Sequence, residues 1–134
     1  MSAALSLQTA MRAALVADST LTRLLGGAHV FDEMPRGAKP PHVTFEQCET
    51  RDWSTATEAG QEHFIQLQVT TAERGRGQAQ AVCDRIAGVL DNASLTLAGH
   101  TLVNLRLVFW SVARSRSDPT FGATLRFRAA TEPN

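Results

Sequence analysis

The chain contains few residues whose types and spacing are suited to metal binding. Its histidines are scattered, and no two of them have the four-residue spacing that places a pair of metal ligands on one face of a helix: His29, His42, His63 and His100. Each is expected to be a surface or edge histidine. Cys48 and Cys83 belong to no CxxC motif or His/Cys cluster, so we expect both to be reduced and Cys83 to be an apolar core residue on a helix. The sequence predicts no metal and no cofactor.

Groups that could bind an anion or transfer a proton are equally sparse. A glycine-rich turn with the sequence RGRG, residues 74–77, precedes a predicted helix, and such a turn can bind an anion through free backbone N–H groups. It lacks both the P-loop pattern and the third glycine of a dinucleotide fingerprint, so we interpret it as a strand-to-helix turn. The acidic pairs Glu58/Glu62 and Asp32/Glu33 have no apolar surroundings that would raise a carboxylate pKa. The sequence therefore predicts a protein that is not an enzyme.

One tryptophan lies in a segment with neither helical nor strand periodicity. Trp53 is surrounded by charged and hydroxyl side chains in the run RDWSTAT, residues 51–57. Tryptophan offers a large, stiff apolar surface with one N–H donor, and it is frequent among the residues that dominate protein interfaces. Two interpretations stand: Trp53 contacts a neighbouring chain, or it folds back over its own core.

Composition indicates a single globular domain covering residues 1–134, with 43% hydrophobic and 19% charged residues. Thirteen cationic residues balance thirteen acidic ones, whereas a nucleic-acid-binding protein normally has an excess of cations. All the cations except Lys39 are arginine, which favours hydrogen-bonded ion pairs at protein interfaces. The N-terminal apolar stretch has no basic leader and is interrupted by Gln8 and Arg12, so we expect no signal peptide, and no run is long enough to span a membrane.

Apolar periodicity predicts the elements that would position these residues. Helical spacing predicts helices over about 5–17 and 78–90, with a short helical piece at 21–25. Alternation predicts strands near 43–46, 64–70, 101–112 and 121–129, a hairpin turn at 98–100 and a long polar loop over 49–61. The order of these elements is typical of an α+β domain, a mostly antiparallel β-sheet with two α-helices packed on one face.

The strand over 101–112 carries apolar residues on both predicted faces. Strict alternation places Val103, Leu105, Leu107 and Phe109 on the covered face, and it places Asn104, Arg106, Val108, Trp110 and Val112 on the other. Together with Phe64, the second row would leave an apolar area that usually marks an association site. The alternative is that a helix or the 49–61 loop of the same chain covers this face.

An ordered set of segments resembles one known family. The segments are LTRLLGG at the end of the leading helical region, VFDEMPRGAKPPHVTF, RDWSTATEAGQEHFIQLQV, LTLAGHTLVNLRL and the closing TLRFRAATEP. Over nearly its whole length the chain resembles the tail-completion, or tail-terminator, proteins of long-tailed phages and of the gene transfer agents of alphaproteobacteria. The resemblance implies an α+β subunit of a homohexameric ring that caps the tail tube, stops its polymerisation and joins the tail to the head connector.

The resemblance also implies partners and a location. The partners are further copies of the chain, the major tail tube protein and the connector or stopper, with DNA only passing through the lumen and no membrane. The location is the tail neck of a virion or phage-like particle assembled in the bacterial cytoplasm. The expected interface residues are Arg51, Asp52 and Trp53, reaching an adjacent ring or subunit, and Phe64, Arg106, Trp110, Arg126 and Arg128, facing a neighbour or the lumen.

Two alternatives remain open at this point. The chain could be the head-side adaptor or stopper of the same neck, or a small ligand-binding or enzymatic α+β domain that uses the RGRG turn or His63.

Overall fold

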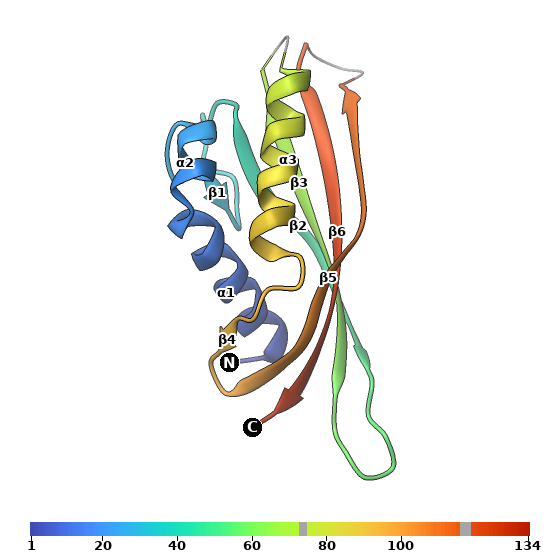
Figure 1. The fold of residues 1–134 in the computed structure, drawn as a ribbon. Helices are drawn as coiled ribbons and strands as arrows, with labels where there is room; N and C mark the ends of the chain where they lie inside the picture. Colours follow the sequence, from blue (N-terminus) through green and yellow to red (C-terminus); the bar gives the residue numbers. More distant parts are fainter. Residues whose placement is uncertain (73–74, 116–118) are drawn as a thin grey trace.

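A computed structural model describes residues 1–72, 75–115 and 119–134 of the chain. In this part of the chain, three helices lie on one side of a six-stranded sheet (Figure 1). The elements are α1 (Ala3–Ala17), α2 (Ser19–Leu25), β1 (Val30–Phe31), β2 (His42–Asp52), β3 (Gln61–Thr71), α3 (Arg76–Leu90), β4 (Thr96–Leu97), β5 (His100–Arg114) and β6 (Phe121–Pro133).

The sheet has the strand order β1-β2-β3-β6-β5-β4. Every neighbouring pair is antiparallel except β1 and β2, which run parallel. The predicted α+β class is confirmed, but two of its details are corrected: the sheet is mixed, and three helices are present in the described residues where two were expected. The four long strands β2, β3, β6 and β5 alternate in direction and form the centre of the sheet.

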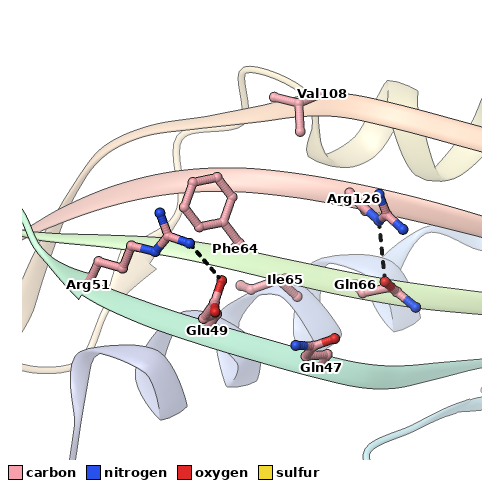
Figure 2. A pocket seen from close by; sticks show the side chains of 8 residues that line it. All are labelled: Gln47, Glu49, Arg51, Phe64, Ile65, Gln66, Val108 and Arg126. Atoms are coloured by element: carbon pink, nitrogen blue, oxygen red, sulfur yellow. Dashed lines mark hydrogen bonds and ion pairs between the residues drawn. The ribbon is translucent and has the colours of Figure 1, made fainter.

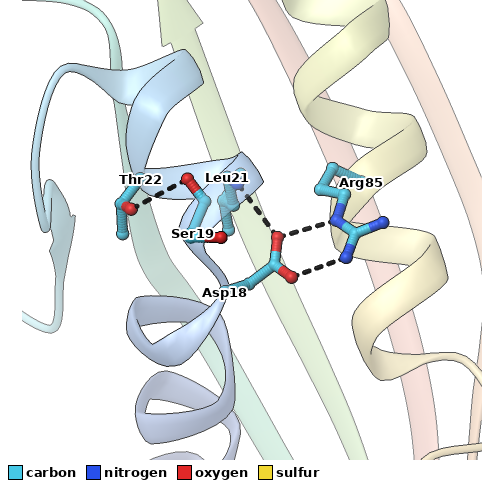
Figure 3. A network of polar contacts seen from close by, with 5 residues as sticks. All are labelled: Asp18, Ser19, Leu21, Thr22 and Arg85. Atoms are coloured by element: carbon cyan, nitrogen blue, oxygen red, sulfur yellow. Dashed lines mark hydrogen bonds and ion pairs between the residues drawn. The ribbon is translucent and has the colours of Figure 1, made fainter.

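Asp18 divides the leading helical region into two helices (Figure 3). Its extended backbone ends α1, and its carboxylate accepts the Leu21 N–H at 2.9 Å as the N-cap of α2. The same carboxylate accepts two hydrogen bonds from the Arg85 guanidinium of α3, at 2.7 and 2.6 Å, and these bonds lower the pKa of Asp18. A single side chain thus fixes α2 against α3.

The hydrophobic core lies between the helices and the covered face of the sheet. The sheet contributes alternate residues of β3 and β6, which face the apolar sides of the three helices: Ile65, Leu67, Val69, Ala123, Leu125, Phe127 and Ala129. Cys83 of α3 is buried in this core, as predicted, and burial raises its pKa to about 12. Helices therefore cover one face of the sheet and leave the other uncovered (Figure 1).

The hairpin of β2 and β3 is longer than the sequence predicted. The residues expected to form a loop over 49–61 continue β2 through Asp52, and only residues 53–60 connect it to β3. This part of the hairpin projects beyond the helical layer (Figure 1). No helix buries one of its faces, so its side chains are polar on both, and the alternation that identifies a half-buried strand is absent.

A β-bulge in β5 reverses the predicted faces of its C-terminal half. The register shifts between Leu107 and Phe109, so that Phe109 pairs with Arg126 and Trp110 pairs with Leu125. Paired residues share a face, so Phe109 lies on the uncovered face and Trp110 on the helix side. The alternation predicted Leu105 and Leu107 correctly, but the one-residue insertion exchanges every side chain after it.

Candidate protein interface

The uncovered face of the sheet brings together six residues that are far apart in the sequence. We call this surface the open face and define it by Arg51, Phe64, Arg106, Phe109, Arg126 and Arg128. Cross-strand pairing sets their positions, because Phe64 pairs with Arg128, which also pairs with Arg106 on its other side. Five of the six were predicted as interface residues from the sequence.

Three arginines of this surface lie over three aromatic rings. Arg51 lies 5.3 Å from the Phe64 ring centroid, and Arg126 lies 4.8 Å from that of Phe109. Arg128 lies 5.5 Å from the Trp53 ring and donates to Glu62 at 2.6 Å. In these positions the arginines partly cover rings that would otherwise be exposed to water. Each exposed cation–π contact contributes about 0.5–1 kcal/mol to stability.

A groove with a volume of about 280 Å³ crosses the open face (Figure 2). Its lining combines apolar side chains with amide and charged groups: Gln47, Glu49, Arg51, Phe64, Ile65, Gln66, Val108 and Arg126. Arg126 donates to the Gln66 amide oxygen at 3.3 Å, and Arg51 pairs with Glu49 at 3.4 Å. This lining contains no nucleophile beside a base.

Trp53 is held at the surface rather than in the core. It begins the β2–β3 loop, its side chain is 43% exposed, and its backbone N–H donates to Gly60 O at 2.9 Å. A Cβ on Gly60 would lie 3.2 Å from the Trp53 carbonyl oxygen and 3.4 Å from its ring, so the absence of a side chain there lets the loop close. Trp53 therefore lies outside the buried core, with close to half of its surface exposed.

Two of the predicted interface residues, Trp110 of the expected outer row and Asp52 beside Trp53, do not lie on the open face. Trp110 is on the helix side of β5, where it is 41% exposed, and Asp52 pairs with Gln61 and accepts a hydrogen bond from the Ser54 hydroxyl at 2.7 Å. Phe109 takes the place predicted for Trp110. The β-bulge at Val108 is what brings Phe109, rather than Trp110, onto the open face. The alternating sequence pattern does not reveal where this bulge lies.

Two histidines are buried, although the sequence predicted surface or edge positions for all four. His63 is completely buried, with Nδ1 3.0 Å from the Thr50 hydroxyl and Nε2 2.8 Å from the Thr131 hydroxyl. His42 is also buried, and its Nδ1 has no hydrogen-bond partner. Burial lowers the pKa of both. Because both ring nitrogens of His63 are engaged, His63 ties three strands together and is not available to a ligand.

These histidines make stability depend on pH. A histidine whose folded pKa lies below its unfolded value of 6.5 contributes stability above pH 6.5 that is lost as the pH falls toward the folded pKa. We expect the free energy of unfolding to decrease on acidification by up to about 1.4 kcal/mol per pH unit for each histidine. Denaturant titrations between about pH 5 and pH 8 measure this slope. The double variant H42N/H63N should flatten it, and an unchanged slope would contradict the assignment.

The RGRG turn fits its predicted role where the structure describes it. Arg74 lies outside the described residues, Gly75 is the N-cap of α3, and Arg76 and Gly77 belong to its first turn. The Thr71 hydroxyl donates to Gly75 O at 2.9 Å, and the Arg76 guanidinium lies over Phe121. Within residues 1–72, 75–115 and 119–134, no three His, Cys, Asp or Glu side chains gather to hold a metal ion, and no helix has the length and hydropathy to cross a membrane.

Comparison with known proteins agrees with this geometry. A protein chain from the virion of a native gene transfer agent particle superposes with a TM-score of 0.88 at 29% sequence identity, covering 98% of this chain and 99% of that chain. The gp17 protein of bacteriophage SPP1 has the same fold, with a TM-score of 0.66 at 19% identity, covering 98% and 91%. Comparison with curated protein sequences gave no significant match. The family model described as tail completion protein gp17 matches residues 9–132, and the chain therefore belongs to this family of structural phage tail proteins, which are not enzymes.

Proposed function

We propose that the chain forms a ring of six copies at the head-proximal end of a tail tube, where it ends tube polymerisation and joins the tail to the head connector. One observation carries this proposal: the chain matches, over nearly its full length, a protein chain from the virion of a gene transfer agent particle. The site of action is the tail neck of a virion or phage-like particle assembled in the bacterial cytoplasm.

The surface of the subunit supports an assembly role. Large apolar side chains that a solitary domain would bury are exposed on the projecting hairpin and on β5: Trp53, Val103, Val108, Phe109 and Trp110. Exposed apolar groups concentrated in this way usually mark contacts with other chains. The partners are sister copies, the major tail tube protein and the connector or stopper.

DNA passes through the lumen of this ring without being gripped. The formal net charge of the chain is zero, and most arginines of the open face are already paired or stacked within the chain: Arg51 with Glu49, Arg106 with Asp91, and Arg128 with Glu62. A protein that holds DNA instead presents unpaired cations to several phosphates, which makes its affinity strongly salt-dependent. A chain with no net charge therefore suits a conduit for DNA better than a clamp.

Deleting the gene from the genome that encodes the particle tests the proposal. Electron microscopy should show overlong tails without heads, and complementation with the wild-type gene should restore tails of normal length joined to heads. Tails of normal length beside tailless, DNA-filled heads would instead identify a head-side adaptor or stopper. Normal particles would refute both roles.

A further inference from the structure

Both lateral edges of the central sheet are unpaired over part of their length. The short strand β1 pairs with the outer side of β2 only at Val43 and Thr44. Further along β2, the stretch Glu46–Asp52 pairs with β3 on its inner side, and no strand of the described residues pairs with its outer side. At the other edge, β4 pairs with the start of β5, and the turn after α3 bonds to Leu105 O and Leu107 N. The stretch from Val108 to Arg114 follows, and within residues 1–72, 75–115 and 119–134 no strand pairs with its outer side. Each free stretch is seven residues long.

An unpaired, apolar strand edge is a template for pairing with another chain. The free stretch of β5 exposes Val108, Phe109 and Trp110. We infer, building on the proposed ring, that the free stretch of β5 pairs with the free stretch of β2 in the neighbouring copy. The sheets of all copies then close into one β-barrel around the lumen.

Strand directions permit this contact. Three successive antiparallel pairings separate β2 from β5, so the two strands run in opposite directions. A rotation about a ring axis keeps those directions, and β5 of one copy therefore meets β2 of the next in antiparallel orientation. This contact joins two different patches and repeats around a closed ring, as a cyclic heterologous interface requires.

The offset between the two free stretches matches the tilt of strands in a barrel. The offset can be measured along β6, which lies between the two edges. Glu49, the centre of the β2 stretch, is in register with Arg128 of β6 through Phe64 of β3. Ser111, the centre of the β5 stretch, pairs directly with Thr124 of β6. These two positions on β6 differ by four residues, or about 13 Å, across four strands that span about 19 Å. These lengths give a strand tilt of about 35°, within the range of closed barrels.

Side chains and charges agree with a specific register. Aligning the centres places Cys48 opposite Val112, and both point to the helix side of their sheets because they pair with Ile65 and Ala123. The same alignment places Glu46 opposite Arg114. The β2 stretch carries three acidic residues and one arginine, whereas the β5 stretch carries an arginine and no acidic residue. Attraction between the edges therefore favours β5 with β2 over two copies of the same edge.

In this barrel the helices lie outside and the open face lines the lumen. A sheet that curves into a barrel carries packed helices on its convex side, as in α/β barrels. The rows containing Phe64, Arg106 and Arg126 then form the inner wall, while the loop with Trp53 is at one rim. The backbone edges of β2 and β5 thus make the subunit contact, and the side chains of the open face line the lumen.

Cross-linking in assembled particles tests the pairing. Cys48 is exposed and Cys83 is buried with a pKa of about 12, so only Cys48 reacts in the natural chain. Val112→Cys adds a second thiol, and Trp110→Cys and Arg114→Cys shift the register by two residues in either direction. Particles complemented with each variant are treated with a short bis-maleimide at mildly alkaline pH, because partial desolvation raises the pKa of the Cys48 thiol. The products are separated on a denaturing gel, and thermal unfolding of each purified variant checks that it folds.

The expected result is a ladder reaching six copies, strongest for Val112→Cys. Products larger than a dimer require two different reacting thiols that meet at the head-to-tail contact. The natural chain and C48S/V112C each have one thiol at this contact, and Ala13→Cys places its second thiol on the exposed surface of α1, away from the contact. These three controls should therefore stop at dimers. Particles with normal tails in which none of the three β5 variants exceeds a dimer would overturn the edge pairing and leave the proposed ring intact. Particles that contain no copy of the chain would instead refute the proposed function, and the pairing with it.

Discussion

Replacing Trp53 with alanine is expected to abolish assembly of the chain into particles while leaving the isolated subunit folded. The side chain is 43% exposed and sits on a projecting loop, so its removal leaves the core untouched. Aromatic residues at the centre of an interface cost about 2 kcal/mol or more when truncated, which is roughly a 30-fold loss in affinity per contact. A ring of several copies loses this amount at every equivalent contact.

The measurement combines particle yield with thermal unfolding of the purified variant. Met34→Ala is the matched control, because Met34 is 42% exposed on another loop and has no predicted contact. We expect the two variants to unfold at similar temperatures and only Trp53→Ala to lose assembly. A Trp53→Ala subunit that unfolds at much lower temperature while particles still form would show that Trp53 serves the stability of its own chain.

Of the proposed substitutions, Phe127→Ala is expected to lower the free energy of unfolding most. Phe127 is fully buried at the centre of β6 beneath the helices, and truncation of such a phenylalanine costs about 3–5 kcal/mol. That loss is a large fraction of the 5–15 kcal/mol by which a typical domain is stable. Urea titration of the purified subunit measures the change as a shift of the midpoint.

Phe109→Ala provides the control and tests the bulge in β5. Phe109 lies on the adjacent strand but on the open face, where its ring contacts Arg126, so its truncation should cost about 1 kcal/mol or less. Strict alternation along β5 predicts instead that Phe109 is buried and that both substitutions are equally damaging. Equal losses would refute the face assignment described by the structure.

The sequence predicted the elements that have one buried face. The helices near 5–17 and 78–90 and the strands around Ile65 and Leu125 were identified because apolar residues recur at the period of each element. The same criterion failed for residues 49–52, which were expected to form a loop, because their side chains are exposed and give no periodic signal. It also failed after Val108, because a single inserted residue leaves the composition of the strand unchanged while exchanging its faces.

The sequence indicated which residues belong to the candidate interface, but not how their side chains contact one another. Trp53, Phe64 and the outer arginines of β6 stood out as apolar or cationic residues where a polar row was expected. Their pairing as arginine–aromatic stacks depends on the register between strands, which no local pattern encodes. The burial of His63 was likewise invisible, since Thr50 and Thr131, which bond its two nitrogens, lie in other strands.

The width of the four long strands of each subunit sets the diameter of the proposed barrel. At a tilt of about 35°, four strands occupy about 23 Å of circumference, so six copies close at a backbone diameter of about 45 Å. One copy fewer would narrow the bore to about 37 Å, and one more would widen it to about 52 Å. The calibre of the conduit is therefore set by the width of a single sheet and the number of copies, and a tube of another calibre would not fit its end.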